Sequence, residues 1–109
     1  MPVTDIRPSY YKRCSPIGRA LLGDAFGRSE YDQECLALID KIEAGFDLGN
    51  ALKYLWRLGV KGAPDDDMKK AAFYLRRYCD RHHDPAMDEV LTRLNNQLSL
   101  YSLVAVSEG

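Results

Sequence analysis

A set of basic, amide and aromatic side chains recurs at helical spacing in the middle of the sequence. At 3.6 residues per turn these side chains fall within an arc of about 100° on one side of a helix. They are Asn50, Lys53, Tyr54 and Arg57. Lysine and arginine match the charge of phosphate, asparagine donates and accepts hydrogen bonds, and tyrosine offers a hydroxyl and a stacking surface. The set therefore suits a nucleotide or a nucleic-acid backbone.

A second stripe of the same character follows on the next expected helix, beyond a glycine-containing loop. It consists of Lys70, Tyr74, Arg77 and Arg81. If the two helices form an antiparallel hairpin, over about residues 48–81, rotation about their axes brings the stripes together. The candidate ligand-binding residues are then Asn50, Lys53, Tyr54, Arg57, Lys61, Lys70, Tyr74 and Arg77. The alternative is that both stripes are solvent-exposed helix faces, on which lysine and arginine are common.

These interpretations differ in what they predict for single side chains. Lys53 and Arg57 lie opposite the apolar stripe, so removing either should change stability by no more than roughly 0.5 kcal/mol, as for an ordinary surface residue. Under the alternative, Arg57 is buried against a carboxylate such as Asp40 or Asp67, and the polar face holds the helices in register. Trp56 lies at the edge of the apolar stripe and is predicted to be structural.

No catalytic residue can be assigned from spacing. The sequence has no Gly-x-x-x-x-Gly-Lys-Ser/Thr loop, which excludes an ordinary P-loop kinase. A kinase on this chain would need magnesium held by scattered carboxylates. The candidates for that role are Asp40, Glu43, Asp47, Asp65, Asp66 and Asp67. The alternative is a solvated helix face and an acidic cluster at the positive end of a helix dipole.

The stretch Cys79 to His83 suggests a metal site, but the sequence predicts none. Zinc needs about four ligands, and no second Cys/His pair exists. Cys35 and Cys79 fall on apolar stripes and are expected to be buried. Three cysteines without paired spacing indicate reduced thiols rather than a disulfide framework.

Composition places the chain among small globular proteins. It has 109 residues, of which 46% are hydrophobic, and a net charge of −1. One modest core is expected, and any phosphate binding must come from a local patch rather than from overall charge. There is no apolar signal region at the start and no run of about 20 apolar residues. A cytoplasmic protein without a membrane span is therefore expected.

Periodicity predicts an all-α, single-domain bundle of four to five short helices. Residues 1–14 form an expected N-terminal arm, and residues 15–109 the helical domain. Helices are predicted from Ser15–Pro16 to about residue 26, from Ser29 to Gly45, from 48 to 58, from 65 to 81, and from Asp84–Pro85 onward. Phe46 is expected to anchor a turn to the core. The apolar tail 98–106 suits either a dimer interface or a cover for the core. For residues 102–109 the choice between a frayed helix and a strand is left open.

The stretch from Gly49 to Leu75 resembles the core of a small phage-associated family of helical domains of uncharacterised function. The resemblance rests on GNxxKYLxRxGxK followed by DxxKAxxYL; here these are Gly49, Asn50, Lys53, Tyr54, Leu55, Arg57, Gly59 and Lys61, then Asp67, Lys70, Ala71, Tyr74 and Leu75. Some phage members resemble nucleotide kinases, which implies a nucleotide ligand. Family members commonly carry a His-Tyr pair before the first matched helix, where this chain has Tyr31-Asp32.

The leading hypothesis is a phage-type protein of the host bacterial cytoplasm that binds a nucleotide or another phosphate ligand, as a kinase-like or a nucleotide-sequestering protein. Magnesium would be the cofactor if it were an enzyme. The alternative hypothesis is a non-catalytic phage protein that binds and inhibits a host protein or a defence complex. Plain nucleic-acid binding is less favoured because the net charge is −1. A homodimer is compatible with either.

Overall fold

Five α-helices make up the computed structural model, which describes residues 12–60 and 62–108 and confirms the all-α fold. The helices are α1 (Pro16–Leu22), α2 (Cys35–Lys41), α3 (Phe46–Arg57), α4 (Pro64–Arg81) and α5 (Pro85–Glu108). Two 3-10 turns, η2 (Gly23–Ala25) and η3 (Arg28–Asp32), connect α1 to α2. Within the described ranges there is no strand.

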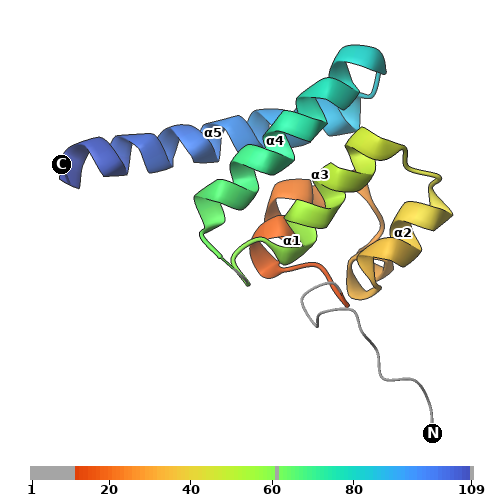
Figure 1. Cartoon of the computed structure of the whole chain (residues 1–109). Helices are drawn as coiled ribbons and strands as arrows, with labels where there is room; N and C mark the ends of the chain where they lie inside the picture. Colours follow the sequence, from red (N-terminus) through yellow and green to blue (C-terminus); the bar gives the residue numbers. More distant parts are fainter. Residues whose placement is uncertain (1–11, 61, 109) are drawn as a thin grey trace, which may run out of the picture.

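Helix α3 lies at the centre, with α4 beside it and α1 and α2 on its other sides (Figure 1). The apolar stripe predicted for α3 is buried, and Leu52, Leu55 and Trp56 are at most 1% exposed. Met68 and Leu75 of α4 close one side of this core. Helix α5 adds a second apolar stripe, which consists of Met87, Val90 and Leu94.

Residues just before α1 tie the N-terminal part of the domain to the end of α3. Ser15 caps α1 as predicted, since its hydroxyl accepts a hydrogen bond from the Gly18 amide (3.0 Å). The same hydroxyl donates to the Leu55 carbonyl (3.2 Å), and the Ser15 amide donates to the Trp56 carbonyl (2.9 Å). Cys14, at the end of the expected arm, is buried in the core. Residues 1–11 of the arm lie outside the described residues.

Gly18 allows this close approach of α1 to α3. A Cβ added there would overlap the Leu55 carbonyl oxygen, whereas one added at Gly49 meets only the Ile39 side chain, at 3.8 Å. We expect Gly18→Ala to destabilise the fold by roughly 1–3 kcal/mol through overpacking. Gly49→Ala, also within a helix, should be neutral or stabilise by up to about 1 kcal/mol. Urea denaturation of both variants checks this, and equal midpoints would contradict it.

The long helix predicted over 29–45 is wrong. Its first part is the turn η3, because Tyr31 turns into the core, where its hydroxyl donates to the Gly23 carbonyl (2.6 Å). Gln33 is extended, and its carbonyl accepts from the Trp56 indole N–H (3.0 Å). The helix proper ends at Lys41, and Glu43 adopts a positive φ of 53° that redirects the chain before Gly45. Tertiary contacts of the backbone therefore override the helical periodicity here.

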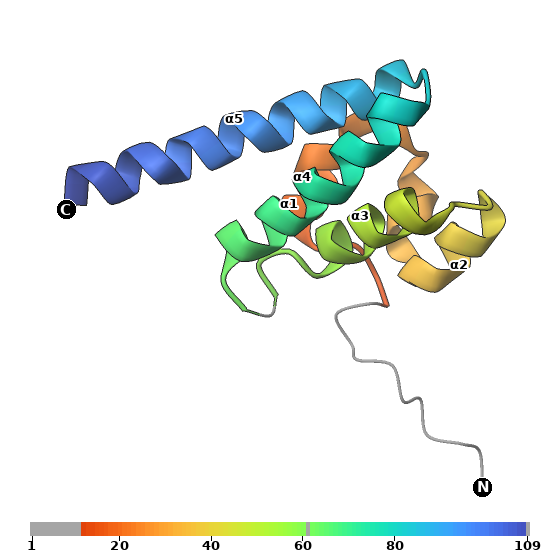
Figure 2. The same cartoon turned by 45° about the horizontal axis from the view of Figure 1, so that its top comes forward.

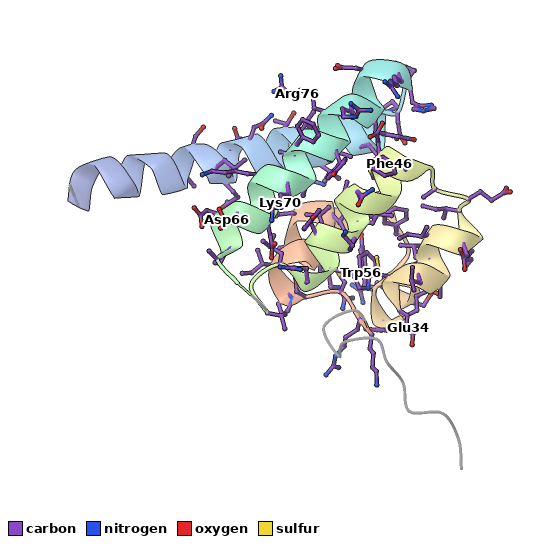
Figure 3. All side chains as sticks on the ribbon, in the orientation of Figure 1. Glu34, Phe46, Trp56, Asp66, Lys70 and Arg76 are labelled. Atoms are coloured by element: carbon purple, nitrogen blue, oxygen red, sulfur yellow. The ribbon has the colours of Figure 1, made fainter. Side chains whose placement is uncertain are left out.

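Two further expectations are also corrected. The first helix stops at Leu22, because Gly23 takes a positive φ of 56° and ends it. Phe46 does not anchor the turn to the core: it opens α3 and is 71% exposed, with its ring edge against Tyr74. Figure 3 shows Phe46 at the end of α3 that lies beside α4.

Helix α5 starts where the sequence predicts, since the Asp84 carboxylate accepts a hydrogen bond from the Met87 amide (3.2 Å). It continues to Glu108, so the C-terminal tail, for which the sequence left helix or strand open, is helical as far as that residue. Both views show its last turns extending beyond the other helices (Figure 2). Across the described ranges, no helix is both long and apolar enough to cross a membrane.

Candidate functional site

The structure brings the two predicted stripes together along the contact between α3 and α4. The rings of Tyr54 and Tyr74 are nearly parallel, with an interplanar angle of 6° and centroids 6.2 Å apart. The edge of Phe46 meets Tyr74 from the start of α3, with centroids 5.7 Å apart. Since α3 and α4 are joined by a short loop and pack closely, this meeting follows from the antiparallel hairpin that the sequence predicts.

Cationic groups gather around the ring of Tyr54. Its centroid lies 4.7 Å from Lys53 Nζ, 5.5 Å from Lys70 Nζ and 5.7 Å from Arg57 Cζ, counting only described side chains. Distances below about 6 Å permit cation–π attraction, which offsets part of the repulsion between the cations. Lys53, Tyr54, Arg57, Lys70 and Tyr74 are called the Tyr54 cluster below. All five were candidates from the sequence.

Arg57 has a second role in this cluster. Its Nε donates to Asp67 Oδ2, and its NH2 group lies 3.3 Å from Asp67 Oδ1. The Asp67 side chain is 2% exposed and that of Arg57 21%. The expectation that Arg57 is an ordinary surface residue therefore needs correction: it neutralises a buried carboxylate at the start of α4, as the alternative hypothesis for this position described.

The remaining candidates lie around the cluster rather than in it. The side-chain amide of Asn50 donates a hydrogen bond to the Phe46 carbonyl, one turn earlier in α3 (2.8 Å). Arg77 Nε donates to Asp47 Oδ1 (2.9 Å), and Arg81 lies 3.6 Å from the other oxygen of this carboxylate. Arg77 thus fastens α4 to the first turn of α3. Lys61 lies outside the described residues.

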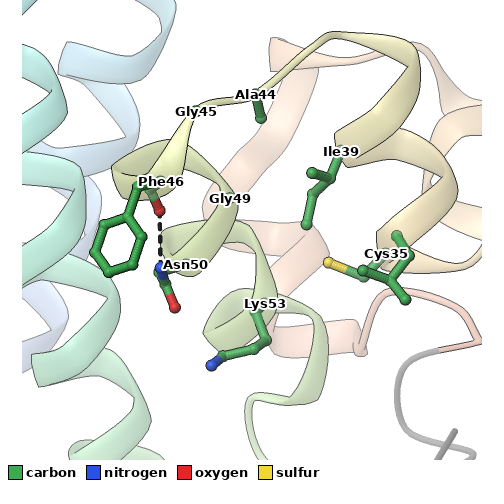
Figure 4. Close-up of a pocket in the computed structure, with 9 residues that line it drawn as sticks. Cys35, Ile39, Ala44, Gly45, Phe46, Gly49, Asn50 and Lys53 are labelled. Carbon is green, nitrogen blue, oxygen red and sulfur yellow. Dashed lines mark hydrogen bonds between the residues drawn. The ribbon is translucent and has the colours of Figure 1, made fainter.

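A hollow of about 420 Å³ opens between α2 and α3, next to the cluster. Its walls are mostly apolar, and Lys53 and Asn50 stand at its α3 side (Figure 4). It is lined by Cys35, Leu36, Ile39, Ala44, Gly45, Phe46, Gly49, Asn50 and Lys53. The stripes on α3 and α4 did not predict that α2 would form one wall of a binding site. Gly49, a small residue inside α3 that faces Ile39 of α2, was the one sequence signal for it. Lys53 is the residue that the hollow and the Tyr54 cluster share.

Neither Cys35, which lines the hollow, nor Cys79, which lies outside the site and is half-buried rather than buried as expected, is arranged as a nucleophile. Burial raises the pKa of the Cys35 thiol to about 12, although the charge of Lys53 acts in the opposite direction. Burial and a hydrogen bond with Asp88 raise the pKa of Cys79 to about 12 as well. Both thiols are therefore protonated near neutral pH, where a thiol is a poor nucleophile and metal ligand.

The residues that suggested metal sites have other contacts. His82 stacks on Tyr78, with ring centroids 4.6 Å apart, and the Tyr78 hydroxyl donates to Asp84 (2.8 Å). Two candidate magnesium ligands, Asp47 and Asp67, hold the ion pairs with arginine given above. In the part of the chain that the structure describes, no three histidine, cysteine or acidic side chains are grouped as metal ligands would be.

Residues 28–76 match the model of a family described as "Protein of unknown function (DUF3310)". The match covers a little under half of the chain, from η3 into α4, and includes the whole Tyr54 cluster. No curated protein matches the chain. No solved structure matches it either. The similarity is thus to an uncharacterised family, and it coincides with the helices that build the candidate site.

Proposed function

We propose that this protein binds a nucleotide or another phosphate ligand at the Tyr54 cluster and the adjoining hollow. The observation that carries the proposal is the convergence of Lys53, Lys70 and Arg57 on the ring of Tyr54. Asp67 neutralises Arg57, but Lys53 and Lys70 bring two further positive charges to the same ring, and an anion beside the ring would balance them. A multiply charged phosphate group fits this requirement.

Lys53 and Lys70 are the cations available to such a ligand. Arg57 is committed to Asp67, whereas neither ammonium group has a carboxylate within ion-pair distance among the described side chains. A phosphate held by these lysines beside the ring of Tyr54 would place the rest of the ligand against that ring or in the hollow that Lys53 lines. Mostly apolar walls with a few polar groups at one side are typical of sites for a flat organic ring.

The resemblance of residues 49–75 to a phage-associated family suggests what such binding would be for. A nucleotide-binding phage protein in the cytoplasm of its host would either phosphorylate the nucleotide, with magnesium, or hold it away from other proteins. Binding is common to both roles, and the proposal commits to binding. The competing hypothesis, inhibition of a host protein or defence complex, requires no nucleotide.

A thermal-shift screen of nucleotides, with and without magnesium, tests the proposal. A ligand that binds only the folded state stabilises it by about 2.7 kcal/mol at a concentration one hundred times its Kd. We expect at least one nucleotide to raise the melting temperature. If none does so at millimolar concentration, a nucleotide ligand is ruled out and the host-protein hypothesis becomes the favoured one.

Lys53→Ala provides the matching variant. Because this side chain makes no ion pair in the described structure, its loss should change stability by no more than roughly 0.5 kcal/mol. The loss of its charge-assisted contact should weaken nucleotide binding by roughly 1.5–3 kcal/mol, measured by calorimetric titration. Lys41→Ala, which removes an equal charge from the exposed end of α2, should leave the affinity unchanged. Equal effects of the two variants would contradict the assignment.

A further inference from the structure

The outer face of α4 carries an exposed aromatic ring surrounded by cations. Phe73 is 59% exposed, and its ring meets Tyr74 edge-on, with centroids 5.2 Å apart. Residues three and four positions away on a helix are its surface neighbours. For Phe73 all four of these positions are basic, and all four side chains are exposed: Lys69, Lys70, Arg76 and Arg77.

The cations of this face are only partly neutralised. Lys69 lies 3.9 Å from Asp65, and Arg77 pairs with Asp47. The Lys69 pair is long and both of its side chains are exposed, so Lys69 can turn to another anion at little cost. Arg77 stays on Asp47, which is mostly buried, and contributes the outward part of its positive charge. Lys70 and Arg76 make no ion pair among the described residues. Figure 3 shows Arg76 on the side of α4 that faces away from α3.

We propose that this face, formed by Lys69, Lys70, Phe73, Arg76 and Arg77, binds single-stranded nucleic acid. A single strand offers what the face lacks: a flat base that can cover the exposed ring, and phosphates on either side of it that can meet the cations. In a duplex the bases are already stacked on one another, so none is free for Phe73. Charge complementarity is local here, because the net charge of the chain is −1.

This activity goes beyond the nucleotide site proposed above. Phe73 and Arg76 do not belong to the Tyr54 cluster, and they lie on the outer side of α4. Lys70 borders both surfaces, since its ammonium group lies 5.5 Å from the ring of Tyr54. A strand on the outer face could therefore place one terminal nucleotide in the cluster, while the two sites remain separable by mutation.

Fluorescence anisotropy of a labelled oligothymidine of about 12 nucleotides, a length within the 4–16 that small single-strand sites cover, tests the inference. We expect binding at low salt that weakens steeply as salt is raised, because released counterions drive it. Phe73→Ala should weaken it by about 5- to 150-fold, the range measured for the loss of one stacked base. Leu100→Ala, which truncates a comparably exposed apolar side chain on α5, should leave it unchanged.

The charge contribution is tested with a second matched pair. Arg76→Glu and Arg28→Glu alter exposed arginines and change the net charge equally. Only Arg76→Glu should weaken binding strongly and lower the slope of log Kd against log salt by about 1 or more. Absence of oligothymidine binding at low salt, or equal effects within either pair, would overturn the inference. So would equally tight binding of a duplex of the same length.

These results are separable from those on the nucleotide site. Lys53→Ala should impair mononucleotide binding, whereas Phe73→Ala should leave it intact. If mononucleotide binding fails while the oligonucleotide still responds to Phe73→Ala, only the proposed function is wrong. If the reverse holds, only the single-strand surface is wrong.

Discussion

Replacing Trp56 with alanine is expected to destabilise the protein by roughly 3–5 kcal/mol. The side chain is fully buried, and its ring packs against Tyr31, with centroids 6.1 Å apart. Its indole N–H donates to the Gln33 carbonyl, which fixes the extended segment between η3 and α2. The substitution therefore leaves a large cavity and an unpaired carbonyl at the point where three segments meet.

Urea denaturation of Trp56→Ala, beside Phe46→Ala, measures this effect. Phe46 is an aromatic residue of the same helix but is 71% exposed, so its loss should cost no more than roughly 0.5 kcal/mol. A domain of this size has only about 5–15 kcal/mol of stability, so the expected loss in Trp56→Ala is a large part of the total and a milder variant is needed beside it. Trp56→Phe keeps most of the ring and loses the hydrogen bond, and should cost less than the alanine variant. Equal midpoints for Trp56→Ala and Phe46→Ala would show that Trp56 is not structural.

Replacing Arg57 with alanine is expected to cost roughly 2–4 kcal/mol, somewhat below a fully buried pair because Arg57 is 21% exposed. Most of this loss of stability arises from Asp67, whose carboxylate is 2% exposed and would lose its guanidinium partner. A change limited to the surface would cost no more than roughly 0.5 kcal/mol, which is what helical periodicity alone predicts. Denaturation of Arg57→Ala separates these two values.

The double variant Arg57→Met/Asp67→Leu provides the control for this pair. It removes both charges together, so most of the stability lost in Arg57→Ala should return. Lys53→Ala, one turn earlier on the same face, should retain the stability of the wild type. If Arg57→Ala behaves like Lys53→Ala, the ion pair with Asp67 contributes little and Arg57 is available to a ligand.

Periodicity predicted the parts of the fold that rest on local signals. The buried stripe of α3, the capping of α1 by Ser15 and the start of α5 after Asp84 all follow from the spacing of apolar residues and from capping chemistry. It failed between residues 29 and 45, where the side chain of Tyr31 and the carbonyl of Gln33 make contacts with distant residues. No local pattern encodes such contacts.

The candidate site shows the same division. Spacing along each helix identified both stripes, and the antiparallel hairpin made their meeting foreseeable. Which carboxylate pairs with Arg57 depends on how α4 is rotated against α3, and for this reason Asp40 and Asp67 were equivalent in the sequence. The hollow depends on how far α2 lies from Gly49, which is likewise a tertiary property.

The most direct test of the nucleotide site is an NMR titration of the ¹⁵N-labelled protein with the nucleotide that gives the largest thermal shift. The proposal predicts saturable changes in the amide signals of Lys53, Tyr54 and Lys70 and of the hollow at Gly49, with those of Arg28 and Leu100 unchanged. Changes confined to other parts of the chain, or none at millimolar nucleotide, would contradict it.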